Sequence, residues 1–359
     1  MVIAAQHGTG LDSRGWGRAE ADDGPAWAAA EGRPVTGMVE TIGGTPLVEL
    51  TRIFAGTPMR VFGKVEGFNP GGSIKDRSAL NLIWANLRSG RLVPGRSIVV
   101  ESSSGNLAIG LAQVCRYFGL KFVGVVDPRT SREKLAVLRA FGAVIDCVDT
   151  VDSVTGEYLS ARIRRVKEII DSTPDAFWPN QYANELNSLA HERTMHEITT
   201  ALDGRVDYLF CATSSGGTLR GCASYVRSHD TGTQVIAVDA EGSGIFRPAT
   251  PVRRLIPGHG AAHRPPLLDG LSPDRVIYVS DADCVAGCRA LVEREALLTG
   301  GSSGGVVAAA DRIRTELPAD SVVVLVFPDR GEGYLDTIYS DDWLAETFGP
   351  HTPTLKGSS

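Results

Sequence analysis

The sequence lacks the patterns that identify several large classes of protein. No apolar run approaches the roughly 20 residues of a membrane-spanning helix. The amino terminus has no basic segment followed by an apolar core, so no secretory signal is predicted. The net charge is -6, which leaves no basic field to attract nucleic acid or anionic lipid. These absences predict a cytoplasmic protein with neither a membrane nor a nucleic-acid partner.

Cysteine and histidine are too scattered to predict a metal site. The six cysteines include no CxxC pair, and the seven histidines form no HExxH-like pattern. Cys284 and Cys288 are four residues apart, but no histidine lies near enough in sequence to suggest zinc. The cysteines are therefore expected to be buried thiols in a reducing compartment, and no bound metal is expected.

The length of 359 residues predicts two domains, because single cores seldom exceed roughly 250–300 residues. Residues 1–35 lack sustained periodicity and are expected to form a flexible extension. An amino-terminal α/β domain is predicted over residues 36–178, and a second α/β domain over residues 179–345. Residues 346–359 are expected to be a flexible tail.

Short apolar runs alternate with amphipathic segments along both predicted domains. Near-continuous Val, Ile, Leu and Phe runs are typical of strands covered on both faces. The predicted strands are 61–65, 97–101, 121–126, 143–148, 208–211, 235–239, 276–279 and 321–327. The predicted helices are 107–118, 132–141, 157–170, 191–202, 219–228, 283–298 and 306–317. This order predicts two open, twisted, mostly parallel sheets flanked by helices, and the first strands could join either sheet.

Lys75 lies in the segment Asn69-Pro-Gly-Gly-Ser-Ile-Lys75-Asp-Arg77, where a turn precedes an apolar pattern of helical spacing. Ser73 is the predicted N-cap of that helix. A helix amino terminus and partial desolvation both lower the pKa of a lysine. An amine with a lowered pKa is suited to forming a Schiff base or carrying a proton. The alternative is an exposed lysine on an ordinary first turn.

Three loops rich in glycine and serine precede predicted helices. In Thr213–Thr218, backbone N–H groups, hydroxyls and a helix start can converge on one anion. This loop lacks the GxxxxGK[ST] and GxGxxG patterns, so a single phosphate group fits it better than a nucleotide. The alternative is a strand-to-helix turn that binds nothing.

The other two loops have less specific patterns. The loop at 101–106 carries Ser102, Ser103, Ser104 and Asn106, which suit a carboxylate and a phenolate-type oxygen; simple N-capping is the alternative. The loop at 300–305 carries Ser302 and Ser303, and could equally be a glycine C-cap. Residues 247–267 hold five prolines and four arginines and are predicted to form a long surface loop or the edge of a lid.

Taken together, these motifs resemble the fold-type II pyridoxal-phosphate enzymes, which share the fold of the tryptophan synthase β-subunit, and in particular the cysteine synthase family. The resemblance runs from about residue 39 to residue 343. It includes Ile42-Gly-Gly-Thr-Pro-Leu47, the segment around Lys75, the three loops, and Pro328-Asp-Arg-Gly-Glu-Gly-Tyr-Leu335. It implies pyridoxal 5'-phosphate as cofactor, small amino acids as substrates, and a homodimer.

The resemblance also implies roles for individual residues. Lys75 would carry the cofactor covalently and later move the substrate α-proton. Asn106 would bond the ring hydroxyl oxygen, and Ser302 would face the pyridine nitrogen. The cofactor phosphate would be held by Ser214, Ser215, Gly216, Gly217 and Thr218.

Two departures from the cysteine synthases are similar to the N-(2-amino-2-carboxyethyl)-L-glutamate synthases. These are Ser102-Ser-Ser-Gly-Asn-Leu107 and Asn180-Gln-Tyr-Ala-Asn184. That resemblance implies a β-replacement in which O-phospho-L-serine loses phosphate and L-glutamate adds to the aminoacrylate. The product would supply 2,3-diaminopropionate for a siderophore or a peptide antibiotic.

The same resemblance implies a substrate site. The donor carboxylate would contact Ser102, Ser103, Ser104 and Gln181. Arg162 and Tyr182 are candidates for the carboxylates of glutamate. A solvated helix face is the alternative for Arg162, and simple packing near the cleft is the alternative for Tyr182. A movable segment at about 107–160 is expected to exclude water on closing.

Three other functions are compatible with these motifs. A cysteine synthase would use sulfide, with O-acetylserine or O-phosphoserine as donor. A non-catalytic sensor or partner-binding relative would retain the fold, although the complete set of motifs around Lys75 argues against it. A threonine dehydratase-like lyase is disfavoured because no regulatory domain follows residue 345.

Overall fold

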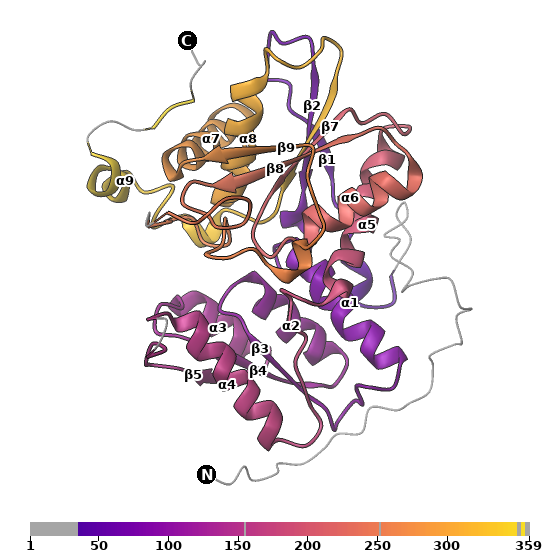
Figure 1. The fold of residues 1–359 in the computed structure, drawn as a ribbon, viewed down its shortest axis with the longest axis vertical. Coiled ribbons are helices and arrows are strands. Elements are labelled where there is room, and N and C mark those ends of the chain that lie inside the picture. Colours follow the sequence, from indigo (N-terminus) through magenta and orange to yellow (C-terminus); the bar gives the residue numbers. More distant parts are fainter. Residues whose placement is uncertain (1–34, 154–155, 251–252, 350–352, 356–359) are drawn as a thin grey trace.

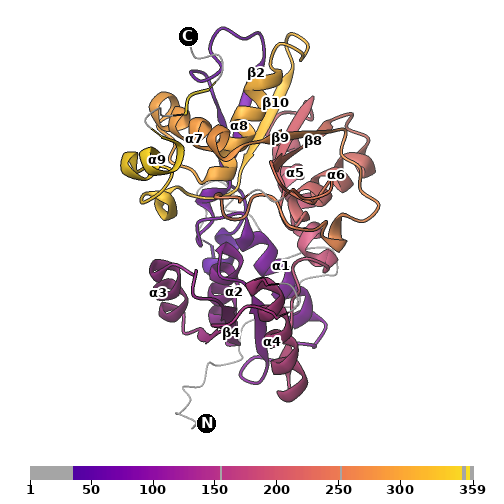
Figure 2. The same ribbon diagram turned by 60° about the vertical axis from the view of Figure 1, so that its left-hand side comes forward.

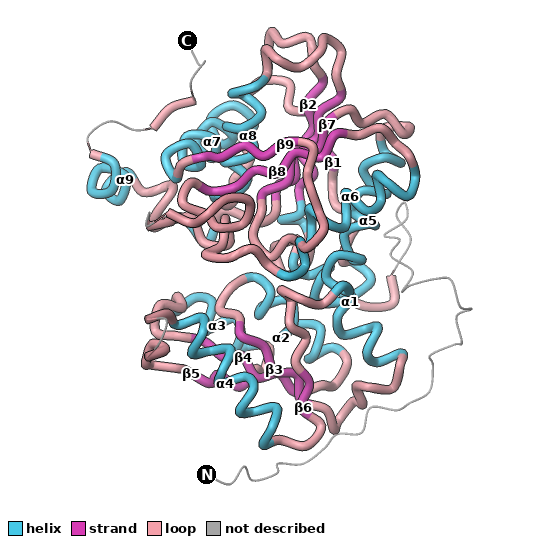
Figure 3. Tube along the Cα trace, viewed as in Figure 1, coloured by secondary structure: helices cyan, strands magenta, loops and turns pink. Residues whose placement is uncertain are grey.

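The computed structural model describes residues 35–153, 156–250, 253–349 and 353–355. Two lobes, each built around its own sheet, lie one above the other in Figure 1. Figure 3 separates the strands of the two sheets from the helices that cover them. The described 3-10 helices are η1 (Met38–Thr41), η2 (Glu66–Phe68), η3 (Pro266–Leu268) and η4 (Glu332–Tyr334).

The larger sheet forms the centre of one lobe. Its strands lie in the order β1 (Leu47–Glu49), β2 (Arg60–Val65), β10 (Val322–Phe327), β7 (Tyr208–Ala212), β8 (Gln234–Ala240) and β9 (Arg275–Val279). β1 runs antiparallel to β2, and the other neighbouring strands of this sheet pair in parallel. Because β2 pairs with β10, the first strands belong to the same sheet as the last one.

Helices cover both faces of the larger sheet. One face packs against α7 (Asp281–Glu295) and α8 (Gly301–Ile313), which lie side by side in Figures 1 and 2. The other face packs against α5 (Glu185–Ala201) and α6 (Gly217–His229). Burial on both faces explains why β10 is apolar along its whole length.

The smaller sheet is parallel in its described pairs. Its order is β5 (Val144–Cys147), β4 (Lys121–Val126), β3 (Ile98–Ser102) and β6 (Ala176–Phe177). One face packs against α1 (Lys75–Arg88), α2 (Asn106–Tyr117) and α3 (Arg132–Ala140). The opposite face packs against α4 (Tyr158–Ser172) through Val166.

The predicted α/β fold with two mostly parallel, helix-flanked sheets is confirmed, and each predicted strand is present with small shifts at its ends. β1 and β6 were not predicted, because two or three residues are too few to show a period. The helix α9 (Asp341–Phe348) was also not predicted. None of the described helices is long and apolar enough to cross a membrane.

Three predicted helix starts are wrong. α8 begins at Gly301, five residues before the predicted start, so the predicted loop at 300–305 is the N-cap and first turn of that helix. The N-cap of α1 is Ile74, while Ser73 accepts a hydrogen bond from the Lys75 N–H at 3.2 Å. α5 begins at Glu185, six residues before the predicted start, because Asn184 caps it by accepting from the Leu186 N–H at 3.1 Å. The polar residues of the first turns of α5 hid its helical periodicity from the sequence pattern.

Candidate active site

A cavity lies where α1 meets the carboxyl ends of β7 and β10. It brings together Lys75, the glycine- and serine-rich loop that precedes α6, and the amino terminus of α8, although these segments are far apart in sequence. Its lining residues are Ile74, Lys75, Ala212, Ser214, Ser215, Gly216, Gly217, Thr218, Leu219, Gly258, Ser302, Val326 and Pro328. In parallel sheets the carboxyl ends of the strands are the usual place for ligands.

Lys75 is the first residue of α1, so its position is fixed by the turn at residues 69–74. Its pKa is lowered because burial removes the ammonium from water, while the negative charges of Asp329 and Glu66 oppose the shift. The predicted lowering of its pKa is therefore confirmed, with burial as its largest cause. A larger fraction of this amine is neutral at a given pH than of an exposed lysine.

The loop between β7 and α6 is shaped for a small anion. Gly216 has φ of +86°, and a Cβ there would lie 2.4 Å from Leu268 Cγ. A Cβ at Gly217, the first residue of α6, would lie 2.6 Å from Asn187 Oδ1. Only glycine fits both positions, and the first N–H groups of a helix have no intrahelical acceptor. They are available to a phosphate group.

The amino terminus of α8 supplies the wall that carries Ser302. Gly300 is the N-cap, and Ser302 and Ser303 follow in the first turn. Both serines are buried, and Ser303 Oγ has no hydrogen-bond partner among the described residues. Ser302 is therefore a hydroxyl that faces the same cavity as Lys75.

The buried carboxyl of Asp329 lies close to Lys75, and sequence patterns did not predict a role for it. Asp329 Oδ2 accepts hydrogen bonds from Asn106 Nδ2 at 2.8 Å and from the Tyr334 hydroxyl at 2.7 Å. Burial raises the pKa of Asp329, whereas Tyr334, Asn106 and Lys75 oppose that shift. Its Oδ1 has no partner within the described ranges. The signal was a polar residue just beyond the apolar strand β10.

The loop after β3 is anchored by hydrogen bonds to a buried glutamate. Glu101 Oε1 accepts from the Ser102 N–H and from the Trp178 indole N–H, both at 2.9 Å. Burial raises the pKa of Glu101 to about 7. These bonds join the predicted carboxylate-binding serines to the segment that carries Gln181, which is itself buried. Glu101 was not predicted to have this part.

Arg162 reaches the same loop from α4. Its Nη1 donates to Ser104 Oγ at 3.1 Å and lies 3.3 Å from Asp127 Oδ2, and its side chain is 12% exposed. The alternative of a solvated helix face is therefore wrong for Arg162. Tyr182 lies near it, because burial and the charge of Glu101 raise the Tyr182 pKa while Arg162 lowers it.

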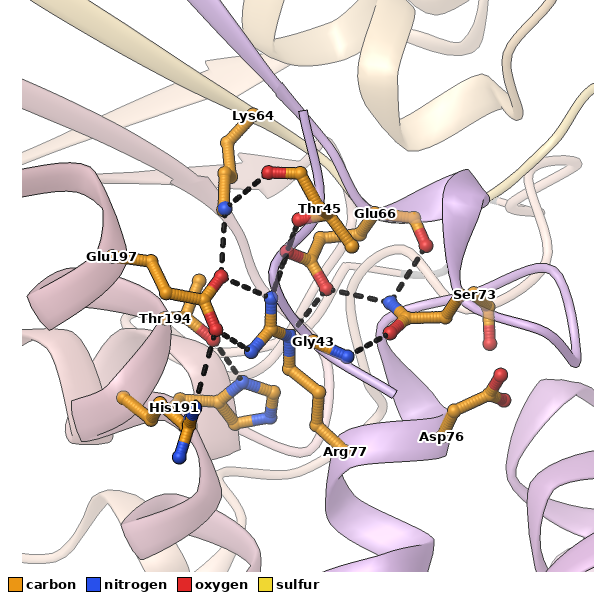
Figure 4. A network of polar contacts seen from close by, with 12 residues as sticks. Gly43, Thr45, Lys64, Glu66, Ser73, Asp76, Arg77, His191, Thr194 and Glu197 are labelled. Carbon is orange, nitrogen blue, oxygen red and sulfur yellow. Dashed lines mark hydrogen bonds and ion pairs between the residues drawn. The ribbon is translucent and has the colours of Figure 1, made fainter. Parts of the chain in front are cut away.

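A cluster of buried charges, which we call the paired cluster, consists of Lys64, Glu66, Arg77 and Glu197 (Figure 4). Arg77 Nε lies 2.6 Å from Glu66 Oε2, and Arg77 Nη2 lies 2.7 Å from Glu197 Oε2. Lys64 Nζ lies 2.7 Å from the same Glu197 oxygen. The cluster ties β2 and η2 to α5 through the helix that begins at Lys75. The sequence did not predict it.

The residues around the cavity fit pyridoxal phosphate. Lys75 supplies an amine of lowered pKa, and the loop before α6 supplies a cup in which two glycines cannot be replaced without a clash. Ser302 supplies a buried hydroxyl on the facing wall. This combination matches a ligand that has an aldehyde, a single phosphate and a ring nitrogen.

Comparisons with known proteins agree with this fit. Residues 38–329 match the family model described as "Pyridoxal-phosphate dependent enzyme". The chain is 48% identical over 309 residues to an N-(2-amino-2-carboxyethyl)-L-glutamate synthase of Ralstonia nicotianae, covering 86% of this chain and 90% of the relative. It is 43% identical over 312 residues to the protein of the same name from Cupriavidus metallidurans, covering 86% and 91%.

Solved structures give the same result. The cysteine synthase of Entamoeba histolytica superposes with a TM-score of 0.80 at 30% identity, covering 90% of this chain and 98% of that one. An O-acetylserine dependent cystathionine beta-synthase of Helicobacter pylori gives 0.79 at 32% identity, covering 86% and 100%. The chain therefore belongs to the family of pyridoxal-phosphate dependent enzymes.

Proposed function

We propose that this enzyme joins O-phospho-L-serine and L-glutamate to give N-(2-amino-2-carboxyethyl)-L-glutamate and phosphate. The observation that carries the proposal is the contact of Arg162, whose side chain is only 12% exposed, with Ser104, in a chain whose relatives of that name cover 86% of its length. A site that accepts sulfide has no need of a buried cation beside its substrate loop, whereas a dicarboxylate nucleophile does.

Pyridoxal phosphate, when bound, supplies an electron sink that stabilises negative charge on the substrate α-carbon. Lys75 would hold it covalently. Asn106 would bond its ring oxygen, and Ser302 would face its ring nitrogen. Its phosphate would be held by Ser214, Ser215, Gly216, Gly217 and Thr218.

Lys75 moves the protons of the reaction. Once the amine of phosphoserine has displaced Lys75 from the cofactor, the freed neutral Nζ would accept the proton from the α-carbon, and the electron pair released there would expel phosphate from the β-carbon. The nitrogen of glutamate would then form the new C–N bond at the β-carbon and release one proton to water. Lys75 returns a proton to the α-carbon, so no redox change is required. The lowered pKa of Lys75 favours the neutral amine that the first step needs.

The serine loop and the segment after β6 bind the amino-acid substrates. Ser102, Ser103, Ser104 and Gln181 hold the carboxylate of the donor. Arg162 and Tyr182 bind a carboxylate of glutamate, since a guanidinium and a hydroxyl are both strong donors to such a group. The hydrogen bonds from Ser102 and Trp178 to Glu101 hold these two segments next to each other.

Several broader features belong to the same proposal. The enzyme acts in the cytoplasm as a homodimer, and its product leads to 2,3-diaminopropionate for a siderophore or a peptide antibiotic. Residues 36–178 and 179–345 act as its two domains, except that β1 and β2 cross to the larger sheet of the second. A segment at about 107–160 closes over the site and excludes water, which would otherwise divert the donor to pyruvate and ammonia.

The test is a product assay with competing nucleophiles. The holoenzyme is incubated with O-phosphoserine and either glutamate or sulfide, and the products are identified by mass spectrometry. We expect the glutamate adduct, with phosphate released in equal amount. Formation of cysteine from sulfide without any glutamate adduct would assign the protein to the cysteine synthases, which its likeness to the Entamoeba histolytica enzyme makes the leading rival.

A further inference from the structure

A second hollow opens beside the cavity of Lys75. It has a volume of about 590 Å³ and is lined by residues that include Gly242, Arg253, Arg254, Gly258 and His263, with Glu157 on the side of the smaller lobe. Gly258 lines both this hollow, which we call the loop pocket, and the Lys75 cavity. A pocket of this size is within the usual range for small-molecule sites.

The glycine at the shared wall places no side chain between the two spaces. Gly258 has φ of +73°, and a Cβ placed on it would meet no atom within 4 Å. Its position therefore faces open space, in contrast to Gly216 and Gly217, which are packed against side chains. A ligand in the loop pocket is separated from the cavity of Lys75 by backbone alone at this point.

The loop pocket has four basic side chains, those of Arg253, Arg254, His259 and His263, and one acidic side chain, that of Glu157, in a protein of net charge -6. Arg253 and His263 are exposed, and neither has a hydrogen bond or ion pair with another described residue. Arg254 Nη1 donates to the Gly242 carbonyl at 3.2 Å. Burial lowers the pKa of His259 to about 4, so this fourth basic residue is neutral near pH 7.

Arg254 differs from its neighbour in being partly engaged. Burial raises the pKa of Asp239 and of Asp281, and the charge of Arg254 opposes both shifts. Its charge is thus shared with carboxylates of the protein. Arg253 and His263 are the basic side chains that remain open to an incoming anion.

We propose that the loop pocket binds the second substrate, glutamate, through a carboxylate held by Arg253 and His263, so that its amine points past Gly258 toward Lys75. This inference rests on the proposed function, because it concerns the nucleophile of that reaction. Guanidinium groups pair with carboxylates in a fixed, bidentate geometry. It also gives a role to the arginine- and proline-rich loop at residues 247–267, to which sequence patterns assign none.

The test is a double variant, Arg253→Ala with His263→Ala, assayed as holoenzyme at pH 7. We expect the KM for glutamate to rise about tenfold, as the loss of a charge-assisted contact predicts, with a much smaller change in kcat. The KM for O-phosphoserine should stay within about twofold, because donor binding uses other residues. The matched control is Arg139→Ala, an exposed arginine of α3 outside both pockets.

Calorimetric titration with glutarate, a dicarboxylate without an amine, gives a second readout that needs no turnover. Its Kd should rise about tenfold in the double variant and stay unchanged in Arg139→Ala. An unchanged Kd and an unchanged KM for glutamate would overturn the inference. An equal rise in the KM for O-phosphoserine would also overturn it, by assigning these side chains to the donor phosphate. A wild-type enzyme that makes no glutamate adduct would instead defeat the proposed function.

Discussion

Two groups of buried polar side chains flank the start of α1, and they differ in how completely they are paired. In the paired cluster, Arg77 lies 2.6 Å from Glu66, and Lys64 lies 2.7 Å from Glu197. Beside the cavity, Lys75 forms no ion pair within 4 Å with a described residue, and Asp329 has one oxygen without a partner there.

This difference in pairing distinguishes residues that support the site from residues that are available for its chemistry. Buried charges that are fully paired fix the relative positions of β2, α1 and α5, because moving any of these elements would leave a buried charge without its partner. Buried groups that are left incompletely paired are available to a ligand. The protein thus holds Lys75 in place with residues on one side and leaves its amine accessible on the other.

The two buried lysines give the sharpest test of this difference. Lys75→Ala should lower β-replacement activity by roughly a thousandfold or more, because it removes the proton carrier. Lys64→Met should lower stability, while the folded fraction keeps most of its activity. Product assays and circular dichroism on both variants check these outcomes.

Borohydride reduction followed by peptide mapping adds a covalent readout. The label should appear at Lys75 in the wild type and at neither lysine in Lys75→Ala. A label at Lys64, or substantial activity in Lys75→Ala, would contradict the division between the two clusters.

Removing the central cation of the paired cluster should have the largest effect on stability. Arg77→Met leaves Glu66 and Glu197 buried without their shared partner, which should cost about 3–5 kcal/mol of unfolding free energy. Arg60→Met is the matched control. Its ion pair with Glu49 is exposed, so the expected loss is below about 1 kcal/mol. Urea unfolding of both variants measures the difference, and equal losses would contradict it.

The two regions should also respond to pH with opposite sign. Glu197 has a lowered pKa through Arg77 and Lys64, although burial opposes them, so its stabilising effect is lost as the pH falls below the usual glutamate range. Glu101 has a raised pKa of about 7 against an ordinary 4.5. The folded state keeps that proton after the unfolded state has lost it, so stability falls as the pH rises from 4.5 toward 7.

Glu101→Gln isolates this second effect. The variant should match the wild type near pH 5 and exceed its unfolding free energy by up to about 3 kcal/mol near pH 8. Burial also raises the pKa of Asp76 to about 7. Its contribution to the pH dependence of stability is the same in the variant and the wild type, so the difference between the two proteins reports Glu101 alone. The raised pKa of Glu101 would be contradicted if the unfolding free energies of the variant and the wild type differed by the same amount at pH 5 and at pH 8.

The smallest expected effect concerns the hydrogen bond from Tyr334 to Asp329. Tyr334→Phe should cost about 1–2 kcal/mol and raise the pKa of Asp329 further, since that bond lowers it. The pH profile of activity should shift with it. Tyr339→Phe is the control, because its hydroxyl donates to the Thr299 carbonyl at 2.6 Å and does not contact Asp329. A shift of equal size in both variants would argue against a special role for Asp329.

The sequence alone determined the features that are written in local patterns. The alternation of buried strands and amphipathic helices determined the α/β fold, because hydrophobic periodicity follows from which faces are covered. The turn before Lys75 and the glycines at 216 and 217 also lie within single short segments. The residue types of these turns could be recognised without knowing the fold, although the contacts of Gly216 with Leu268 and of Gly217 with Asn187 could not.

Only the tertiary structure decided which distant residues became partners. Glu66 and Glu197 are separated by more than a hundred residues yet share Arg77, and Asn106 meets Asp329 across the two lobes. The burial that raises the pKa of Glu101 likewise depends on packing of Trp178 against it. Long-range pairing and desolvation depend on how the sheets are arranged in space, and no local pattern of residue types encodes them.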